Sequence, residues 1–250
     1  MERLKRKTAK NHCFAFLITF GLLFPAQAVA ETIHVAVASN FVSTAKKIAE
    51  AFKKDTDQKI LLSSGSTGKI YAQILKGAPY DIFLSADSKT IDLLQARTAD
   101  RVTYALGKLV LLGSKRTALK ESVSASLNTS DLGKLAIANP KTAPYGRAAV
   151  ETLTSLGALE KLKPYFVTGE NIAQTYQFVA TGNASFGFVA LSQVQNLNKS
   201  RYKIIHQDLY SPIRQDAALL SHSKDKPGAR AFFSFLKSDA AKEIVRQSGY

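Results

Sequence analysis

The sequence predicts an α/β fold divided into two lobes. Short apolar runs alternate with segments whose apolar residues recur at helical spacing, and this alternation is typical of parallel sheets flanked by helices. The pattern occupies both halves of the chain, without an internal repeat or a long linker. An N-terminal segment of about 30 residues precedes it and leaves about 220 residues, which suit two modest cores better than one very large sheet.

Residues 1–30 have the features of an export signal. Five bases and one acid stand among the first ten positions, an apolar stretch runs from Cys13 to Phe24, and the small residues 28–30 form an A-x-A cleavage site. The apolar stretch is too short to span a bilayer. We therefore expect cleavage after Ala30 and a periplasmic mature protein, which would contain no cysteine because Cys13 is the only one.

The first half of the chain contains apolar runs with the length of buried strands, at 33–38, 59–62, 82–85 and 108–112. A helix is expected after the first run, where apolar residues recur at helical spacing over 41–52. The helix after the second run is expected to end at Gly77 and Pro79, which disfavour its continuation. Asp87 or Ser88 is expected to cap the helix after the third run, because both side chains can accept hydrogen bonds from first-turn N–H groups.

The second half follows the same pattern, with strands expected at 135–138, 166–167, 185–190, 204–205 and 217–220. A loop over 139–146 precedes a helix over 147–156, which Gly157 ends. The next helix opens at 168–171 and closes at residues 182–183. Two further helices are expected to finish the chain, over 229–236 and around 244–245.

Two polar segments lie where a predicted strand gives way to a predicted helix. Ser39-Asn40 follows the first strand, and Ser66-Thr67 follows the second. The first N–H groups of a helix lack partners within the helix, and the helix dipole places partial positive charge there, so both segments favour a bound anion. Ser39 and Thr67 are also suited to capping the helices, since capping uses the same N–H groups. The sequence thus predicts a binder of small anions outside the cytoplasm.

Several motifs, in order along the chain, resemble those of the substrate-binding proteins of molybdate ABC importers. They are VAVASNF at 35–41, SGSTGKIYAQI at 64–74, GAPYDIFLSAD at 77–87, ANP at 138–140 with PYG at 144–146, and GFVALS at 187–192. The resemblance covers nearly all of residues 31–250. It implies a two-lobed type II periplasmic binding protein, in which each lobe is a mainly parallel sheet flanked by helices and two crossing segments join the lobes. On this basis we expect one lobe over 31–110 and 214–250, and the other over 111–213.

The resemblance also implies the ligand, molybdate or tungstate, and its contacts in this chain. The first lobe would contribute hydroxyls from two strand-to-helix turns, and the second lobe a tyrosine after the Asn-Pro pair and a backbone N–H at a helix start. These positions are Ser39 with neighbouring Asn40, Thr67 with neighbouring Ser66, Tyr145, and Ile172. One branch of the family has a further tyrosine just past the Gly-x-Val strand, where this chain has Ala190. Tyr145 resembles the other branch, in which the tyrosine comes from the loop.

A shell of hydroxyl and N–H donors suits a divalent oxyanion, which offers only acceptors at neutral pH. Molybdenum would be held as the oxyanion, without direct protein ligands to the metal. Phosphate keeps a proton near neutral pH and favours a site that contains an acceptor. A site for another oxyanion, such as sulfate or phosphate, is the nearest alternative, and a periplasmic hydrolase is the alternative from another class.

The motifs of other functional classes are incomplete. Gly68-Lys69 is similar to part of a phosphate loop, but the Walker A sequence requires Gly where Ser63 stands and Ser or Thr where Ile70 stands. No Gly-x-Ser-x-Gly sequence occurs, and metal-ligand spacing is lacking for the histidines His34, His206 and His222. We therefore expect no catalytic residue, no enzyme activity and no cofactor. The expected partner is the membrane permease of an ABC importer, which would supply the energy for transport.

The chain is strongly basic. Its net charge of +15 becomes +11 without residues 1–30, which hold five bases and one acid. Such a charge is often found in proteins that bind nucleic acid, but here the lysines and arginines are scattered, without an arginine-rich run or interleaved aromatic residues. Lys69, Lys108 and Arg147 are accordingly expected to be solvated. We expect a monomer with no nucleic-acid partner.

Overall fold

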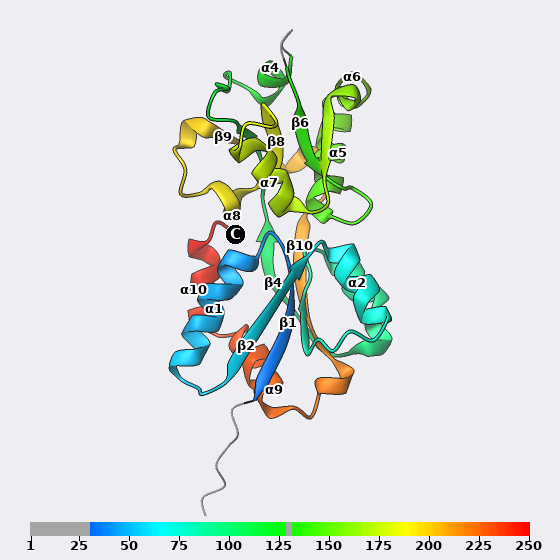
Figure 1. Cartoon of the computed structure of the whole chain (residues 1–250), viewed down its shortest axis with the longest axis vertical. Helices are drawn as coiled ribbons and strands as arrows, with labels where there is room; N and C mark the ends of the chain where they lie inside the picture. Colours follow the sequence, from blue (N-terminus) through cyan, green and yellow to red (C-terminus); the bar gives the residue numbers. More distant parts are fainter. Residues whose placement is uncertain (1–30, 129–131) are drawn as a thin grey trace, which may run out of the picture.

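The computed structural model describes residues 31–128 and 132–250, which form two lobes stacked along the long axis of the molecule (Figure 1). Each lobe contains a five-stranded sheet with helices on both faces. This arrangement confirms the predicted two-lobed α/β fold. The expected export signal, with its cleavage site after Ala30, lies outside the described residues. Within the described ranges, no helix is both long enough and apolar enough to cross a membrane.

The sheet of the first lobe has the strand order β2-β1-β3-β10-β4. Its strands are β1 (Thr32–Ala38), β2 (Lys59–Gly65), β3 (Ile82–Leu84), β4 (Thr98–Gly107) and β10 (Ile213–Leu220). The helices that cover it are α1 (Val42–Lys54), α2 (Thr67–Leu75), α3 (Ser88–Leu93), α9 (Pro227–Phe235) and α10 (Asp239–Gln247). Apolar residues of α1, α9 and α10 pack on one face of the sheet, and those of α2 and α3 pack on the other.

The sheet of the second lobe has the strand order β7-β6-β8-β5-β9. Its strands are β5 (Leu109–Gly113), β6 (Leu135–Ala138), β7 (Phe166–Gly169), β8 (Phe186–Ala190) and β9 (Tyr202–Ile204). The accompanying helices are α4 (Val123–Leu127), α5 (Pro144–Ser155), α6 (Leu159–Leu162), α7 (Ile172–Ala180) and α8 (Leu191–Val194). Helices α4, α5 and α6 pack on one face, and α7 and α8 pack on the other. Short 3-10 turns complete the chain at Gln95–Arg97, Lys163–Tyr165, Lys199–Arg201, Gln207–Leu209 and Ser221–Ser223.

Both sheets are mixed but mainly parallel, as expected: in each, four strands run in one direction and one strand, β10 or β5, runs in the other. In the first, β1 pairs in parallel with β2 and β3, whereas β10 is antiparallel to β3 and β4. In the second, β6 pairs in parallel with β7 and β8, whereas β5 is antiparallel to β8 and β9. The antiparallel direction results from the crossing between the lobes. The parallel strands end at the edge of the sheet that faces the other lobe. Strands β5 and β10 begin at that edge, because the chain enters them from the other lobe.

The chain crosses between the sheets twice. It leaves the first sheet at Gly107 and enters the second at Leu109, and it returns over 205–212 to enter β10 at Ile213. From these crossings we propose lobe boundaries at Lys108 and within 205–212, close to the expected 110/111 and 213/214.

The elements differ locally from the expected ones. Helix α5 starts at Pro144 rather than at residue 147, because proline is well suited to the first helical position. Strand β10 starts at Ile213 rather than at residue 217, and the long strand β4 was not anticipated. The carboxylate of Asp87 accepts a hydrogen bond of 2.9 Å from the Thr90 N–H, which confirms Asp87 as the cap of α3.

Candidate functional site

One small cavity between the lobes brings together all the residues expected at the anion site. They are Ser39, Asn40, Ser66 and Thr67 from the first lobe, with Tyr145 and Ile172 from the second. The remaining lining residues are small or apolar: Ala38, Gly65, Ala86, Ala143 and Pro144. The cavity measures about 10 Å³, roughly the space that one water molecule needs. The lobes are therefore closed around it.

Two buried hydroxyls reach the cavity from the start of α2. Ser66 is 3% exposed, and its Oγ has no hydrogen-bond partner among the described residues. The Oγ1 of Thr67 accepts a hydrogen bond of 3.1 Å from the backbone N–H of Ala86, so the hydroxyl hydrogen of Thr67 is left to donate elsewhere. An unpartnered buried hydroxyl is costly. A bound anion would provide an acceptor for both hydroxyls.

Ser39 and Asn40 form the turn between β1 and α1. The Ser39 N–H donates a hydrogen bond of 3.0 Å to the carbonyl of Gly65, which ties this turn to the end of β2. The side-chain Nδ2 of Asn40 donates to Oε1 of Gln215 at 2.9 Å and to the Tyr250 hydroxyl at 3.1 Å. The amide of Asn40 therefore holds the turn in place beside the cavity.

Neither Ser39 nor Thr67 acts as a helix cap. The residue that precedes α1 is Phe41 and the one that precedes α2 is Ser66, and neither N-terminus has a side-chain cap hydrogen bond. The structure therefore removes the alternative in which these hydroxyls only terminate helices.

Tyr145 lies in the first turn of α5, directly after Pro144. Its side chain is 1% exposed, and its hydroxyl accepts a hydrogen bond of 3.2 Å from Nε2 of Gln215. Burial raises the pKa of Tyr145 well above its usual value, so the phenol keeps its proton at neutral pH. Gly107 makes room for the hydroxyl, since a Cβ at that position would collide with it. Tyr145 is thus a neutral donor beside the cavity.

Helix α7 begins at Ile172 and is capped by Asn171. The Oδ1 of Asn171 accepts hydrogen bonds from the N–H groups of Ala173 at 3.0 Å and Gln174 at 3.1 Å. This cap satisfies the second and third N–H groups of the helix and leaves the N–H of Ile172, the first residue, for the cavity. The Ile172 carbonyl accepts a hydrogen bond of 3.1 Å from Nε2 of Gln193, which steadies the turn from the side of α8.

The electrostatic character of the cavity follows from the elements around it. Most of its lining residues precede or begin α1, α2, α5 and α7, Ala86 precedes α3, and none of the lining residues carries a carboxylate. Helix N-termini carry partial positive charge and free N–H donors. The arrangement therefore favours a small anion with acceptor atoms on all sides.

Polar contacts join the two lobes around the cavity. They include the hydrogen bond from the Gly68 N–H to the Thr142 carbonyl at 2.9 Å, the ion pair of Arg147 with Asp87, and the ion pair of Lys69 with Glu170 at 2.8 Å. Lys69 and Arg147 were expected to be solvated. They are half-exposed but paired, because closure brings acidic residues of the opposite lobe to them. Such contacts can only form when the lobes are closed.

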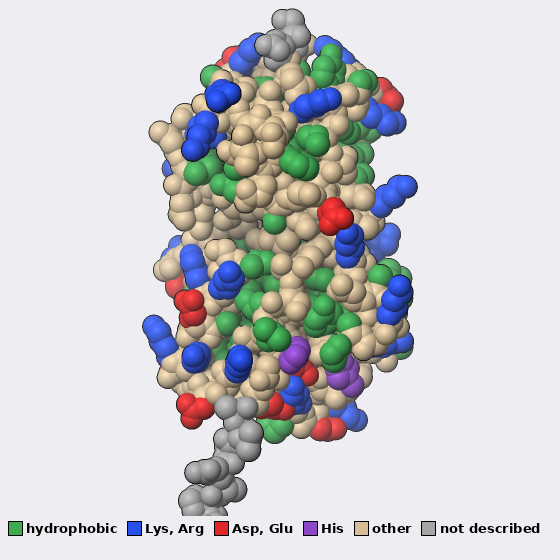
Figure 2. All heavy atoms as spheres, in the orientation of Figure 1, with side chains coloured by type: hydrophobic (Ala, Val, Ile, Leu, Met, Phe, Trp, Pro, Cys, Tyr) green, Lys and Arg blue, Asp and Glu red, His purple; other side chains and the backbone are tan. Residues whose placement is uncertain are grey.

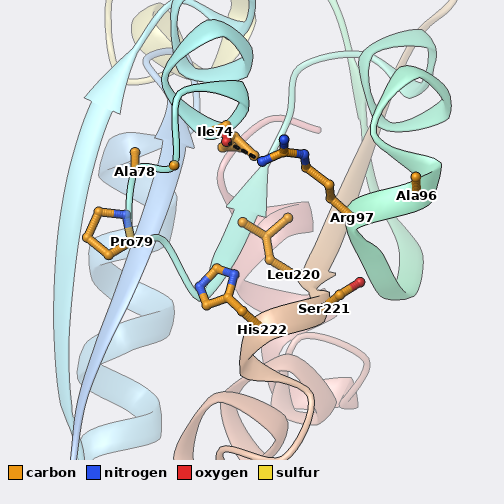
Figure 3. A pocket seen from close by; sticks show the side chains of 9 residues that line it. Ile74, Ala78, Pro79, Ala96, Arg97, Leu220, Ser221 and His222 are labelled. Carbon is orange, nitrogen blue, oxygen red and sulfur yellow. Dashed lines mark hydrogen bonds between the residues drawn. The ribbon is translucent and has the colours of Figure 1, made fainter.

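A larger hollow of about 350 Å³ lies within the first lobe (Figure 3). It adjoins the turn after the C-terminal end of α2, and its one arginine, Arg97, donates a hydrogen bond of 3.0 Å to the Ile74 carbonyl. Partial negative charge at a helix C-terminus disfavours anions. All of its lining residues come from one lobe, so lobe closure would not enclose a ligand there. The cavity between the lobes is the better candidate.

Sequence reasoning missed the buried and partly buried groups that support the cavity. These are Gln215 on β10, Tyr104 on β4, Tyr250, and the backbone N–H of Ala86. Gln215 gave a signal, since Gln215-Asp216 are polar residues directly before the apolar run 217–220. Both are fully buried, and a buried polar pair inside a strand requires partners.

Comparison with known proteins gives concordant results. The chain matches the family model described as bacterial extracellular solute-binding protein over residues 33–250. It is 47% identical over 238 residues to the molybdate-binding protein ModA of Azotobacter vinelandii, and the aligned region covers 92% of this chain and 93% of that protein. It is 43% identical over 248 residues to the molybdate-binding protein ModA of Rhodobacter capsulatus, and the aligned region covers 98% of this chain and 97% of that protein.

A solved structure shows the same architecture. The periplasmic molybdate-binding protein of Azotobacter vinelandii matches this chain with a TM-score of 0.80 and 35% sequence identity. The match covers 87% of this chain and 98% of that one. Both lobes are therefore shared with a binding protein of known structure.

Proposed function

The chain belongs to the bacterial extracellular solute-binding proteins, and from this premise we propose that it captures molybdate in the periplasm and delivers it to an ABC importer. The relatives at 47% and 43% identity, which span nearly the whole chain, are molybdate-binding proteins. The chemistry of the cavity is consistent with that ligand, and the closed lobes are consistent with capture.

The observation that carries the proposal is the set of donors at the cavity. The hydroxyl of Ser66 has no partner among the described residues, and the hydroxyl of Thr67 already accepts from Ala86. Both are therefore free to donate to an acceptor. A molybdate dianion presents four oxygens that only accept hydrogen bonds, so it matches donors that converge from two lobes.

The proposed ligand contacts are distributed over both lobes. Hydroxyls of Ser39, Ser66, Thr67 and Tyr145 would donate to the oxyanion, together with backbone N–H groups of Asn40 and Ile172. The molybdenum would have no direct protein ligand. Tungstate has the same shape and charge as molybdate, so we propose that it binds as well.

Phosphate is disfavoured by the same arrangement. Hydrogen phosphate carries a proton that needs an acceptor, and the oxygens of Thr67 and Tyr145 already accept hydrogen bonds from Ala86 and Gln215. That proton would therefore use a hydroxyl oxygen such as that of Ser66 as acceptor, at the cost of a donor to the anion. Among the described residues, no carboxylate lines the cavity to take that proton. Sulfate carries no proton at neutral pH, so the site would have to distinguish sulfate from molybdate by the smaller size of sulfate.

The finer points of the proposal follow from the sequence. Export would be followed by cleavage after Ala30, and the mature protein would act as a monomer with a membrane permease as partner. We propose no catalytic residue, no cofactor and no nucleic-acid partner. A periplasmic hydrolase would differ from this protein in turning its ligand over.

Calorimetric titration of residues 31–250 with molybdate, tungstate, sulfate and phosphate tests the proposal. We expect molybdate and tungstate to bind roughly a hundredfold or more tightly than the other two, a difference of about 2.7 kcal/mol. Equal affinity for sulfate or phosphate would contradict it. Hydrolysis of phosphate or sulfate esters by the purified protein would favour the hydrolase instead.

A further inference from the structure

The amide of Gln215 lies at the centre of a buried hydrogen-bond network beside the cavity. Gln215 is fully buried near the start of β10, where the chain re-enters the first lobe. Its Oε1 accepts a hydrogen bond of 2.9 Å from Asn40 Nδ2. The Tyr104 hydroxyl has one hydrogen, which it shares between the Ser85 carbonyl at 2.9 Å and this Oε1 at 3.1 Å. The Nε2 of Gln215 donates to the Tyr145 hydroxyl at 3.2 Å. One side chain therefore links a cavity residue of the first lobe, Asn40, to one of the second, Tyr145.

The network has a direction. The Tyr250 hydroxyl donates to the backbone carbonyl of Asn40 at 2.9 Å, so its oxygen requires a donor, which is Asn40 Nδ2. The same Nδ2 also contacts the Gln215 amide, and because Nδ2 is a donor, the atom of Gln215 that it contacts is the oxygen, Oε1. The Gln215 Nε2 is then directed to Tyr145. Amide orientations are assigned from such networks, and here the hydrogen bonds of Tyr250 and Asn40 set the orientation of the Gln215 amide.

We propose that Gln215 is a positioning residue of the oxyanion site: by donating to the oxygen of Tyr145, it leaves the hydroxyl hydrogen of Tyr145 to donate into the cavity. The inference rests on the proposed function, because it assigns a cause to one of the proposed ligand contacts. With a carbonyl oxygen at the same place, the tyrosine would donate to the protein and not to the anion. Burial raises the pKa of Tyr145, so the hydrogen is present at neutral pH.

Double-mutant cycles test the inference. Gln215→Met keeps the side-chain length but removes the donor, and Tyr145→Phe removes the hydroxyl on which Gln215 is proposed to act. Molybdate affinity would be measured by calorimetry for the wild type, both single variants and the double variant. We expect Gln215→Met alone to weaken binding about tenfold, and the same change in the Tyr145→Phe background to weaken it by less than about threefold.

A matched control exists in the same region of the chain. Gln207 lies in the second crossing segment, is exposed, and donates from Nε2 to the Tyr210 carbonyl at 2.9 Å, away from the cavity lining. Gln207→Met should leave molybdate affinity unchanged. Gln215→Glu is a second variant in case Gln215→Met fails to fold. Its carboxylate would accept the Tyr145 hydrogen and repel the dianion, so we expect a loss larger than tenfold, which Tyr145→Phe should again reduce.

Equal losses in both backgrounds would overturn the inference, because Gln215 would then act through packing or through Asn40. The proposed function is decided separately by the wild type. If the wild type binds sulfate and not molybdate, the proposed function fails, and the same cycle with sulfate still decides the role of Gln215. If the wild type binds none of the oxyanions, both proposals fail.

Discussion

The backbone N–H of Gly68 donates a hydrogen bond of 2.9 Å to the carbonyl of Thr142, across the line where the two lobes meet. Gly68 is the second residue of α2, and Thr142 lies two residues before α5. A Cβ on Gly68 would stand 3.1 Å from the Thr142 Cα and 3.2 Å from its carbonyl oxygen. Such distances are tighter than ordinary contacts, so a side chain at position 68 would require Thr142 to shift by a few tenths of an ångström in the closed arrangement.

Gly68→Ala should separate the stability of the free protein from its affinity. Alanine favours a helix over glycine by up to about 1 kcal/mol, so the unliganded variant should be at least as stable as the wild type. The added methyl group would push on Thr142 in the closed state at a cost of roughly 1–3 kcal/mol, which is about a 5- to 150-fold loss of molybdate affinity. Thermal unfolding without ligand and calorimetry with ligand measure the two effects. Unchanged affinity would show that the contact is not needed for closure.

Ser66→Ala should also change stability and affinity in opposite directions. The Ser66 hydroxyl is buried without a partner among the described residues, and it makes no cap hydrogen bond to α2. Its removal should leave the free protein as stable or more stable by about 1 kcal/mol, since an unsatisfied buried hydroxyl is costly. Loss of a donor to a dianion should weaken molybdate binding roughly tenfold or more.

The control for Ser66→Ala is Ser64→Ala, two residues earlier on β2, where the side chain is exposed. This control should change neither the unfolding temperature nor the affinity. A Ser66→Ala protein that is less stable but binds molybdate normally would assign Ser66 to the fold and remove it from the ligand contacts.

The two cross-lobe ion pairs should contribute unequally to binding. The carboxylate of Asp87 is 12% exposed where it meets Arg147, whereas Lys69 and Glu170 are 51% and 64% exposed. Exposed pairs contribute about 0–1 kcal/mol. Lys69→Gln should therefore change molybdate affinity less than about threefold, and Arg147→Gln should weaken it more, mainly through faster dissociation. Stopped-flow tyrosine fluorescence measures both rate constants, and equal effects of the two substitutions would contradict this ranking.

The sequence predicted those parts of the fold that depend on local patterns. Strands β3 and β6 are apolar throughout and buried, and β1 is apolar and buried from Val35 to Ala38, so their runs are visible in the sequence. Strand β4 was missed because it lies at the edge of its sheet and exposes polar residues such as Arg101 and Thr103. The antiparallel strands were missed because their direction depends on the crossing between lobes, which no local pattern reveals.

For the candidate site too, the sequence predicted the features that depend on local patterns. Ser39 and Thr67 lie at strand-to-helix turns, and such turns can be located from periodicity and composition. The bond between Gly68 and Thr142 could not be predicted, because it joins residues of different lobes in the closed state. Gln215 was missed for the same reason, since its partners Asn40 and Tyr145 are 175 and 70 residues away along the chain.

Alkaline pH should destabilise the protein through its buried tyrosines. Burial raises the pKa values of Tyr104, Tyr145 and Tyr250 above the usual 10.0. Below pH 10 both the folded and the unfolded chain keep these protons. Above it the unfolded chain releases them and the folded chain does not, so the free energy of unfolding falls by up to about 1.4 kcal/mol per pH unit for each tyrosine.

Urea unfolding at pH 8, 9, 10 and 11 measures this effect, and Tyr145→Phe provides the comparison. The variant should lose stability less steeply than the wild type above about pH 10, because one of the groups is gone. Lysines titrate in the same range but are common to both proteins. Identical slopes would show that Tyr145 ionises as readily in the folded chain as in the unfolded one.

Salt should affect molybdate binding only modestly, although the chain without residues 1–30 has a net charge of +11. Figure 2 shows lysines and arginines scattered over both lobes of the visible face. A protein that neutralises about 6–10 phosphates of DNA loses roughly a thousandfold or more in affinity between about 50 and 200 mM salt. A single dianion held by hydroxyl and N–H donors in a closed cavity is different, because salt screens the long-range attraction of the surface much more than the buried contacts.

The salt effect on molybdate should therefore lie mainly in the association rate, with a much smaller change in the dissociation rate. Stopped-flow tyrosine fluorescence is suited to the measurement, since residues 31–250 contain nine tyrosines and no tryptophan. DNA binding by the same protein at about 150 mM salt serves as the comparison. A steep salt dependence of the molybdate equilibrium constant, or tight binding of DNA, would mean that the scattered surface charge governs binding, and the four helix starts around the cavity would then lose their proposed role.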